Sequence, residues 1–336
     1  PKQMYIPAHS LDDLLRSVFE KLLSTKSRID PTKGPATEIA GVLLKIGNPR
    51  MRLSRTETKG TLFSCLGELM WYLAGTHSLA FIRYYLPQYI DFSDDHRTVY
   101  GGYGPRMFGQ GRNRQVLNVI ELLKRKPDSR QAVIQLFDAA DIMEDHKDIP
   151  CTCTLQFLVR QNKLQLFTSM RSNDAFRGLP HDVFAFTMIQ EIVARALNVE
   201  LGVYKHMVGS LHLYDHDRTG AERYLGEDWQ SKVAMPMMPF GDPWPGVKAL
   251  LKAESKLRNG NDLDIHGLAL HSYWADLARI LKVFQLTKTK TDTRKAARII
   301  KHIASPVYLP YLKKRLEQKI ATVTPQQLEI FTVEEK

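Results

Sequence analysis

The amino-acid sequence predicts an α+β fold: a mixed sheet covered by helices, with an extra helical segment at the C-terminus. Three observations support this. Strand-like runs dominate the middle of the chain, amphipathic runs at helical spacing lie before, between and after them, and near residue 235 a Pro/Gly-rich loop leads into mostly helical sequence. We therefore expect one large domain over residues 1–235 and a helical extension over 236–336 packed on it.

The predicted elements follow from local pattern. Residues 9–24 place apolar side chains at helical spacing after a Ser or Asp cap, residues 38–47 form a strand closed by a turn sequence, and residues 61–75 form a strongly apolar helix ending at Gly75. The remaining predicted elements are a helix over 114–126, a strand over 131–138, two strands over 151–172 around a turn at Gln161-Asn162, a long buried helix over 181–198, and a strand leading into a helix over 204–217.

Composition limits the class of protein. The chain has 336 residues, of which 43% are hydrophobic and 25% charged, as in ordinary globular proteins. No apolar run approaches the ~18 residues that a membrane span needs, and the first residues lack a signal-peptide pattern, so we expect a cytoplasmic protein. Three cysteines, Cys65, Cys151 and Cys153, argue against a disulfide scaffold.

The net charge of +11 indicates a phosphate-bearing partner, either a nucleic acid or a small nucleotide. Part of this charge lies in two basic runs of the C-terminal third. Such runs are more often a solvated helix face than a binding surface.

Residues suited to chemistry cluster between residues 150 and 182. Cys151 follows a proline, and Arg171 with Ser172 could clamp a phosphate. A Gly-Leu-Pro turn at 178–180 then leads into a helix. Each feature alone is weak, because a lone cysteine in apolar surroundings usually packs as a small hydrophobe.

Taken in order, these motifs resemble the thymidylate synthases and their relatives, the pyrimidine nucleotide hydroxymethylases. The family's Pro-Cys segment is matched by Pro150-Cys151, its Arg-Ser-x-Asp-x-Phe-x-Gly-Leu-Pro segment by residues 171–180, and its Gly-x-x-His-x-Tyr strand by residues 209–214. Upstream, GELMWYLAG, YGPRM and PDSRQ resemble the family's glutamate helix, Tyr-Gly turn and phosphate-binding arginine loop. The resemblance covers residues 35–220 and implies the family's fold.

The resemblance also implies catalytic roles. Cys151 would attack C6 of the pyrimidine as a thiolate, which activates C5. Glu68 would organise water and relay protons, and Tyr103 would line the pocket near the nucleophile. Asp174 would contact the pterin of the cosubstrate, 5,10-methylenetetrahydrofolate, with Gly178 leaving room for it. For Glu68 the alternative is a carboxylate on an exposed helix face, which fits poorly inside an apolar run.

Substrate-binding roles follow in the same way. Arg171, Ser172 and Arg130 would bind the 5′-phosphate, and His212 and Tyr214 would hydrogen-bond the ribose. In the family the counterpart of Arg130 reaches across from the neighbouring subunit, so the resemblance implies a homodimer with shared sites. No metal is expected, because the histidines show no ligand spacing.

One departure from the family concerns the base. Thymidylate synthases have Asn two residues after the Gly-Leu-Pro turn, where this chain has Asp182. A carboxylate accepts hydrogen bonds from the cytosine N4 amino group and from a protonated N3, but repels the O4 of uracil. Asp182 therefore favours a cytidylate. The alternative is that Asp182 only caps the following helix.

Further departures concern the phosphate and folate sites. Thr152 replaces the His that usually follows the nucleophile, Met170 replaces a Gln, and Gln131 replaces a second phosphate-binding Arg. The N-terminal Arg-Thr-Gly phosphate loop has no counterpart, and Lys33 is the candidate to replace it. The family's Pro-Val-rich C-terminal tail also has no counterpart.

Ala175 bears on the sugar. The family usually has a larger residue there, and a small side chain could admit a ribose 2′-OH, although packing alone could also explain it. The prediction is 5-hydroxymethylation of CMP, similar to the cytidylate hydroxymethylases of pyrimidine-antibiotic pathways, with no nucleic-acid or membrane partner. The alternatives are a dCMP hydroxymethylase, a thymidylate synthase acting on dUMP, and a basic nucleic-acid-binding protein on a degenerate fold.

Overall fold

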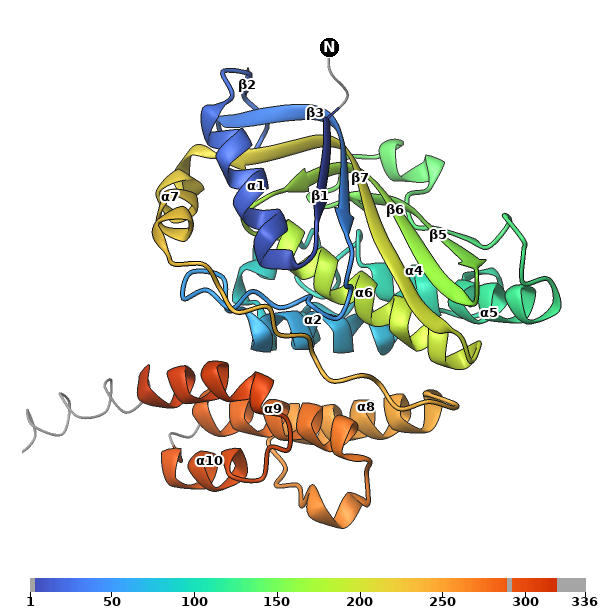
Figure 1. The fold of residues 1–336 in the computed structure, drawn as a ribbon, viewed down its shortest axis with the longest axis vertical. Helices are drawn as coiled ribbons and strands as arrows, with labels where there is room; N and C mark the ends of the chain where they lie inside the picture. The colour runs from blue at the N-terminus through green and yellow to red at the C-terminus, as the bar shows by residue number, and fades with distance from the viewer. Residues whose placement is uncertain (1–3, 289–291, 319–336) are drawn as a thin grey trace, which may run out of the picture. The chain divides into compact units, whose positions relative to one another are not determined.

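In the computed structural model, which describes residues 4–288 and 292–318, the central element is a mixed sheet of seven strands (Figure 1). The strands are β1 Met4–Ala8, β2 Arg28–Ile29, β3 Ala36–Ile46, β4 Val133–Gln135, β5 Thr152–Arg160, β6 Lys163–Asp174 and β7 Glu200–Tyr214. Their order in the sheet is β1-β3-β7-β6-β5-β4, and β2 pairs with the outer part of β3. The pairs β1–β3 and β6–β7 are parallel and the others antiparallel, so the predicted mixed α+β sheet is confirmed.

Strands β5 and β6 form a hairpin that begins directly after the candidate nucleophile, Cys151. Gln161 and Asn162 connect them with φ angles of 51° and 56°. Two consecutive residues of positive φ are typical of the tight turn whose twist matches that of the flanking strands. The turn therefore fixes the register of β5 against β6, and with it the position of Cys151 beside Arg171.

Helices cover one face of this sheet. The helices of the first part of the chain are α1 Leu11–Ser24, α2 Leu62–Leu73, α3 Leu79–Tyr85, α4 Tyr103–Phe108, α5 Gln115–Arg125, α6 Gly178–Ala196 and α7 Arg218–Gly226. Helix α1 packs on β1 and β3, α6 packs on β6 and β7, and α2 packs on α6 (Figure 1). Along β7 the buried Tyr204, His206 and Val208 alternate with the more exposed Lys205 and Met207, as expected for a sheet with one covered face.

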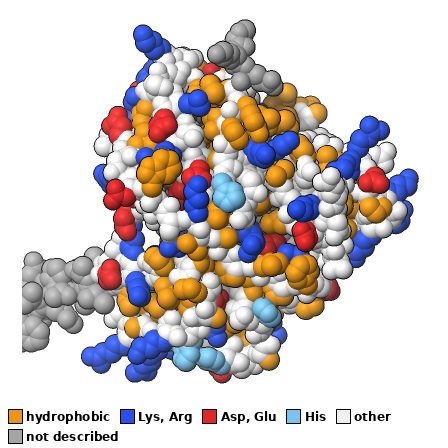
Figure 2. All heavy atoms as spheres, in the orientation of Figure 1, with side chains coloured by type: hydrophobic (Ala, Val, Ile, Leu, Met, Phe, Trp, Pro, Cys, Tyr) orange, Lys and Arg blue, Asp and Glu red, His pale blue; other side chains and the backbone are white. Residues whose placement is uncertain are grey.

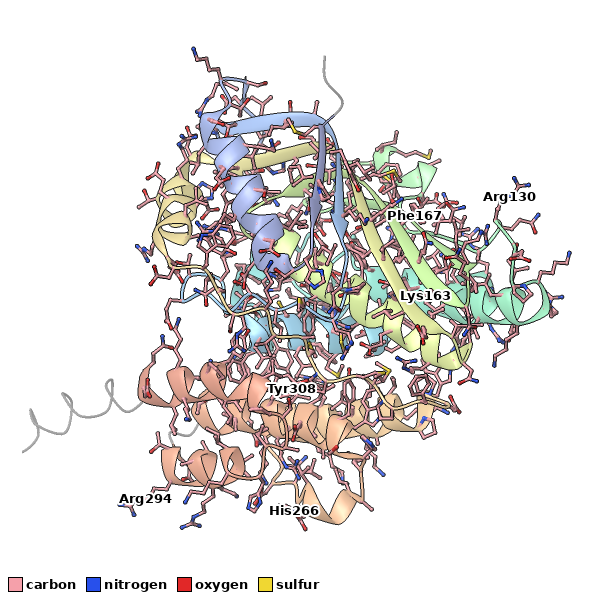
Figure 3. The ribbon with its side chains drawn as sticks, in the orientation of Figure 1. Arg130, Lys163, Phe167, His266, Arg294 and Tyr308 are labelled. Carbon is pink, nitrogen blue, oxygen red and sulfur yellow. The ribbon has the colours of Figure 1, made fainter. Side chains whose placement is uncertain are left out.

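The side chains on the other face of the sheet are more exposed. This face presents Phe167 of β6 and Met207 of β7, and the ammonium of Lys205 lies 4.9 Å from the centre of the Phe167 ring (Figure 3). Met207 exposes 40% of its surface, which is high for a large apolar side chain on a central strand.

Short elements complete the fold. The 3₁₀ helices are η1 Pro87–Phe92, η2 Gly111–Asn113, η3 Ala139–Ile142, η4 Asp215–Asp217, η5 His266–Leu268 and η6 Pro306–Tyr308. The pattern analysis did not anticipate β1, β2, α3 or α4, because each is too short to show a periodicity.

The chain divides into two compact units, Pro1–Pro243 and Trp244–Lys336. The loop before residue 243 belongs to the first unit, because the Met235 N–H donates to Arg50 O at 2.8 Å and the Met238 N–H donates to Glu191 Oε1 at 2.9 Å. The division therefore comes later than the expected position at 235/236. The expected packing of the extension on the first part stays a prediction.

The second unit is helical. It contains α8 Trp244–Arg258, α9 Ser272–Lys288 and α10 Thr293–Ile300, with a further helical stretch over 309–318. Helix α9 packs against both α8 and α10, and its buried Asp276 forms an ion pair with Arg279 at 2.9 Å. Arg294 and Arg298 are exposed on α10, in a region where basic side chains gather (Figures 2 and 3). Within the described residues, no helix is long and apolar enough to cross a membrane.

Candidate active site

Cys151 lies immediately before β5, and Arg171 of β6 fixes the segment that bears it. The Arg171 N–H donates to Cys151 O at 2.9 Å, and the guanidinium donates to Pro150 O at 3.0 Å and to Ile149 O at 3.1 Å. The same guanidinium approaches the Cys151 sulfur, with Nη2 at 3.7 Å from Sγ. Arg171 thus both fixes the segment that bears Cys151 and places a positive charge beside the sulfur.

The environment of Cys151 raises the pKa of its thiol from 9.0 to about 11. Removal of the sulfur from water is the main cause, and the carboxyls of Asp148 and Asp182 add to it, while Arg171 and Lys33 oppose it. At neutral pH the thiol therefore keeps its proton in the free protein, and the expected role as nucleophile would require a nearby group or water to accept that proton.

Tyr103, at the start of α4, holds the residue after Cys151. Its hydroxyl oxygen accepts hydrogen bonds from the Thr152 N–H at 3.1 Å and from the Thr152 hydroxyl at 3.0 Å. Burial raises the pKa of this phenol well above its usual value, so its own proton remains available for donation. Thr152, where the family usually has His, thus has a specific partner in this structure.

Glu68 of α2 is buried, with 5% of its surface exposed. Its Oε1 accepts hydrogen bonds from the hydroxyls of Tyr72, at 3.1 Å, and Tyr89. Burial and the neighbouring Glu68 charge raise the pKa of both phenols well above the usual value, so both remain donors. Glu68 is therefore not a carboxylate on an exposed helix face. Among the described residues Oε2 has no hydrogen-bond partner, which leaves it available to water or substrate.

Asp182 is held by a side chain of the sheet. Helix α6 begins at Gly178, so Asp182 lies in its second turn, beyond the capping positions. Its Oδ2 accepts a hydrogen bond from Asn173 Nδ2 at 2.8 Å, and no backbone N–H of the described residues donates to it. The alternative that Asp182 is a helix cap is therefore wrong. Burial, and next the charge of Glu68, raise the pKa of this carboxyl to about 8.

The partner of Asp182 was missed by the motif analysis. Asn173 occupies the variable position of the Arg-Ser-x-Asp motif and is 3% exposed. Its Oδ1 lies 3.0 Å from His206 Nε2, and His206 Nδ1 lies 2.7 Å from the Tyr204 hydroxyl. The only sequence signal for this network was slight: Tyr204 and His206 are polar aromatic residues two positions apart, so they lie on the same, covered face of β7.

Asp174 and Gly178 shape the turn into α6. Asp174 Oδ1 accepts hydrogen bonds from the N–H groups of Phe176, at 2.8 Å, and Arg177, at 3.0 Å. A Cβ added at Gly178 would lie 3.0 Å from Asn173 Nδ2. Glycine at 178 therefore leaves room for the amide that binds Asp182. The expected contacts of Asp174 and Gly178 with folate stay predictions.

Lys59 is a second residue that the motifs did not reveal. Its ammonium is buried and lies 3.6 Å from the centre of the Phe176 ring, and Asp174 is the nearby charge that most favours its protonated form. Burial nevertheless lowers the pKa of this lysine to about 8. A cation of this kind beside Asp174 would suit a carbonyl or carboxylate group of a ligand.

The expected sugar-binding residues lie together at the end of β7. His212 and Tyr214 are mostly buried, with their rings edge to face at 4.9 Å between centroids. The Ala175 N–H donates to His212 O at 2.8 Å, and Ala175 is fully buried. Ser172 of β6 pairs with Ser210 of β7 in the sheet. Adjacent strands of one sheet, and the helix packed on it, thus provide the candidate site residues. These are Cys151, Arg171, Asp182, His212 and Tyr214.

Comparison with known proteins agrees with this arrangement. The family model described as thymidylate synthase matches residues 11–242. The chain belongs to the thymidylate synthase family. A curated relative, the deoxyuridylate hydroxymethyltransferase of Delftia phage PhiW-14, is 29% identical over an alignment of 195 residues, and the match covers 54% of this chain and 54% of the relative. The present chain thus matches about half the length of that relative.

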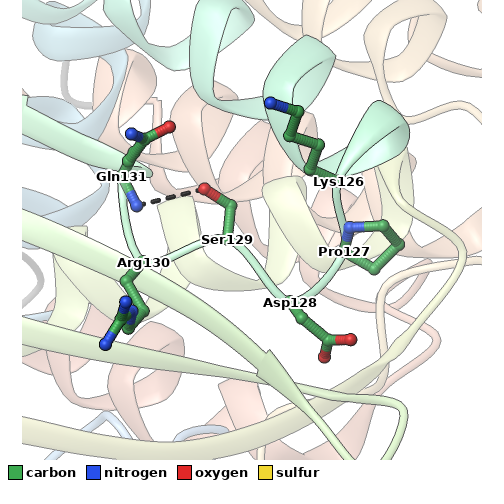
Figure 4. A pocket seen from close by; sticks show the side chains of 6 residues that line it. All are labelled: Lys126, Pro127, Asp128, Ser129, Arg130 and Gln131. Carbon is green, nitrogen blue, oxygen red and sulfur yellow. Dashed lines mark hydrogen bonds between the residues drawn. The ribbon is translucent and has the colours of Figure 1, made fainter.

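Arg130 and Lys33, the two expected phosphate ligands from loops of this thymidylate synthase family member, differ in their position relative to Cys151. Arg130 is exposed in the loop after α5, in a shallow pocket lined by residues 126–131, where the Gln131 N–H donates to Ser129 Oγ at 3.1 Å (Figure 4). Figure 3 shows Arg130 at the edge of the molecule. Lys33, in contrast, is one of the charges that act on Cys151, and its ammonium lies 4.0 Å from the centre of the Phe92 ring.

His, Cys, Asp and Glu are the residue types that commonly bind metals. Over residues 4–288 and 292–318, no three His, Cys, Asp or Glu side chains converge to form a metal site.

Proposed function

We propose that this thymidylate synthase family member is a folate-dependent hydroxymethyltransferase acting on a cytidine 5′-monophosphate, with CMP preferred to dCMP. The observation that carries the proposal is the side chain of Asp182, whose Oδ2 is bound by Asn173 while Oδ1 has no hydrogen-bond partner among the described residues. The relative named a hydroxymethyltransferase supports the transfer of a hydroxymethyl group. Because that relative is named for deoxyuridylate, the choice of base is argued from Asp182.

A carboxylate distinguishes the two pyrimidines by hydrogen-bond direction. Ionised Asp182 can only accept, so it matches the N4 amino group of cytosine and the N3 proton that cytosine gains when C6 is attacked. The O4 of uracil is itself an acceptor and would face the carboxylate without a proton between them. Leaving such a buried pair mismatched costs roughly 1–3 kcal/mol, and more with a charge.

The proposed chemistry needs no change in oxidation state overall. The Cys151 sulfur adds to C6, and C5 attacks the methylene carbon of 5,10-methylenetetrahydrofolate. Loss of the C5 proton and departure of tetrahydrofolate leave an exocyclic methylene group. Water adds to that methylene, the bond from Cys151 to C6 breaks, and the products are 5-hydroxymethyl-CMP and tetrahydrofolate. Glu68, with its free Oε2, is the proposed group that positions the water.

The remaining residues are proposed to bind substrate. Arg171, Ser172 and Lys33 would bind the 5′-phosphate, while His212 and Tyr214 would contact the ribose. Asp174 and Lys59 would face the folate.

The decisive experiment combines the protein with methylenetetrahydrofolate and CMP, dCMP, UMP or dUMP, and determines product masses. We expect a gain of one hydroxymethyl group on the cytidylates and no dihydrofolate. Asp182→Asn should lower kcat/KM for cytidylates and raise it for uridylates, changing the preference by about tenfold to several hundredfold. Thr187→Val, which removes a buried hydroxyl of the same helix, is the matched control and should leave the preference unchanged.

Two results would contradict the proposal. If the unmodified protein prefers uridylates, the assignment of cytidylate fails. If dihydrofolate accumulates, the protein is a thymidylate synthase. The sugar is tested separately: Ala175→Val should lower kcat/KM for CMP more than for dCMP.

Deoxyuridylate hydroxymethylation is the second candidate. It is favoured by the name of the relative and by the raised pKa of Asp182, because a protonated carboxyl, like an amide, can donate to O4.

A further inference from the structure

Four polar side chains form a continuous chain from the sheet to the candidate base site. The Tyr204 hydroxyl lies 2.7 Å from His206 Nδ1, His206 Nε2 lies 3.0 Å from Asn173 Oδ1, and Asn173 Nδ2 lies 2.8 Å from Asp182 Oδ2. Tyr204, His206 and Asn173 expose 0%, 1% and 3% of their surfaces. Buried polar atoms are costly unless bonded, so this alignment makes a built network rather than a chance contact.

When Asp182 is ionised, the direction of every hydrogen bond in this chain is fixed. Asp182 offers a carboxyl oxygen, so the Asn173 group facing it must be the NH₂, and Asn173 Oδ1 must then accept from His206 Nε2. Burial lowers the pKa of His206 to about 3, so the ring is neutral and its Nδ1 must be the acceptor. Burial also raises the pKa of Tyr204 well above its usual value, so this phenol is the donor.

We propose that Tyr204, His206 and Asn173 are positioning residues that hold Oδ2 of Asp182 and leave Oδ1 to read the substituent at C4 of the base. The inference rests on the proposed function, because it assumes that Asp182 faces the base. Among the described residues, the side-chain hydrogen bonds of Asn173 and His206 run along this chain and none reaches Cys151, so these residues would act through Asp182. Their effect is to select one orientation of the carboxyl group and to favour its ionised form through the donated Asn173 proton.

The charge of Asp182 depends on several neighbours. The titratable groups that act on it or respond to it are Glu68 and Tyr72 of α2, Tyr103 of α4, Cys151 before β5, Asp174 of β6, His181 of α6 and Tyr204 of β7. Burial and Glu68 raise the pKa of Asp182, whereas the Asn173 hydrogen bond lowers it. Removal of the Asn173 amide should therefore keep Asp182 protonated to higher pH and free the carboxyl to rotate. Both changes favour uracil.

The test measures kcat/KM for CMP, dCMP, UMP and dUMP from about pH 6 to 10. In Asn173→Leu we expect the ratio of cytidylate to uridylate activity to fall about tenfold, with its pH midpoint moved upward. His206→Phe should move the ratio in the same direction, because Asn173 loses the partner that orients it. His206→Gln, whose amide can still donate to Asn173, should keep the ratio within about twofold of the unmodified protein.

A purely structural role would give a different result. If Asn173→Leu and His206→Phe lower kcat/KM for all four nucleotides by one common factor, with the midpoint unmoved, the three residues only pack and the proposal is overturned. Should Asn173→Leu not fold, the comparison of His206→Phe with His206→Gln decides the same point. A uridylate preference in the unmodified protein would refute the proposed function but not the positioning role. The positioning role is judged from the change in the ratio that Asn173→Leu causes, whatever ratio the unmodified protein shows.

Discussion

Cys151 is the residue on which the proposed chemistry depends, and Cys153 provides its natural control. Both are free cysteines of intermediate exposure, two positions apart. Cys151→Ala should abolish turnover, and also the exchange of the C5 hydrogen with solvent, because both need the bond from sulfur to C6. Cys153→Ala should retain both activities. Tritium release from 5-tritiated nucleotide measures the exchange, and an active Cys151→Ala protein would remove this residue as the nucleophile.

Asp148 limits the reactivity of that nucleophile. Burial raises the pKa of its carboxyl to about 6, and its charge adds to the raised pKa of the Cys151 thiol. Asp148→Asn removes this charge, so the pKa of Cys151 should fall and the thiolate fraction near pH 8 should rise several-fold, about as expected for a shift of half a unit or more. Alkylation by iodoacetamide, followed by mass spectrometry in a Cys153→Ala background, measures it. An unchanged rate would show that Asp148 does not act on the sulfur.

The raised pKa of Asp182 makes base choice depend on pH. Below its pKa of about 8 the carboxyl has a proton that it can donate to uracil O4, and above it the carboxylate only accepts. The ratio of cytidylate to uridylate kcat/KM should therefore increase as the pH rises through 8, chiefly because uridylate activity is lost. Asp182→Asn cannot titrate, so its ratio should be flat. Titration of Cys151 would affect both nucleotides alike and cancel in the ratio.

At the scale of the elements, the long helices and strands could be predicted and the short ones could not. The apolar spacing of residues 9–24 predicted α1, and the turn at Gln161-Asn162 predicted the β5–β6 hairpin. The two-residue β2 and the six-residue α4 contain less than two periods of any pattern, and tertiary contacts hold them. Local sequence has no means of indicating such contacts.

The difference between local pattern and tertiary contact also explains which candidate site residues could be predicted from the sequence. The motif placed Cys151 and Asp182 because each has a fixed distance along the chain from a recognisable neighbour. Asn173 and His206 lie 33 residues apart and meet only because β6 and β7 pair in the sheet. Tyr89, which donates to Glu68, comes from a 3₁₀ segment with no pattern of its own. The residues that hydrogen-bond to the candidate site groups Asp182 and Glu68 could therefore be identified only from the structure.

Helix α6 is fixed by a buried ion pair as well as by apolar packing. Arg52 and Glu191 are fully buried with 2.6 Å between Nη2 and Oε2, and Glu191 also accepts from the Met238 N–H. Glu191→Leu should lower the free energy of unfolding by about 3–5 kcal/mol, because it leaves a buried guanidinium unpaired. Adding Arg52→Met should recover most of that loss. Urea denaturation measures the free energy of unfolding of both variants. If the double variant is no more stable than Glu191→Leu alone, the unpaired guanidinium is not the cause of the loss.

For the whole molecule, two features favour a second copy of the chain. The face of the sheet that presents Phe167 and Met207 is partly exposed, with Met207 40% exposed. Arg130, whose motif predicts a phosphate ligand, has an exposed side chain in the loop after α5 (Figure 3), and its backbone O accepts a hydrogen bond from Gln156 Nε2 at 3.0 Å. A homodimer in which Arg130 of each copy completes the phosphate site of the other would account for both features.

Complementation tests this homodimer directly. In a heterodimer of Arg130→Ala and Cys151→Ala chains, one site has both defects and the other has neither, because the arginine and the cysteine of each site come from different chains. Two weakly active or inactive parents should therefore regain roughly half the activity of an equal amount of unmodified protein in purified heterodimers, since one of two sites is intact. The matched control joins Arg171→Ala with Cys151→Ala: Arg171 lies 3.7 Å from the sulfur of its own chain, so one site loses Arg171 and the other loses Cys151, and no site is whole. Recovery in the first pair and none in the second would place Arg130 across the interface. Equal failure of both pairs, in heterodimers verified by mass, would place the whole phosphate site within one chain.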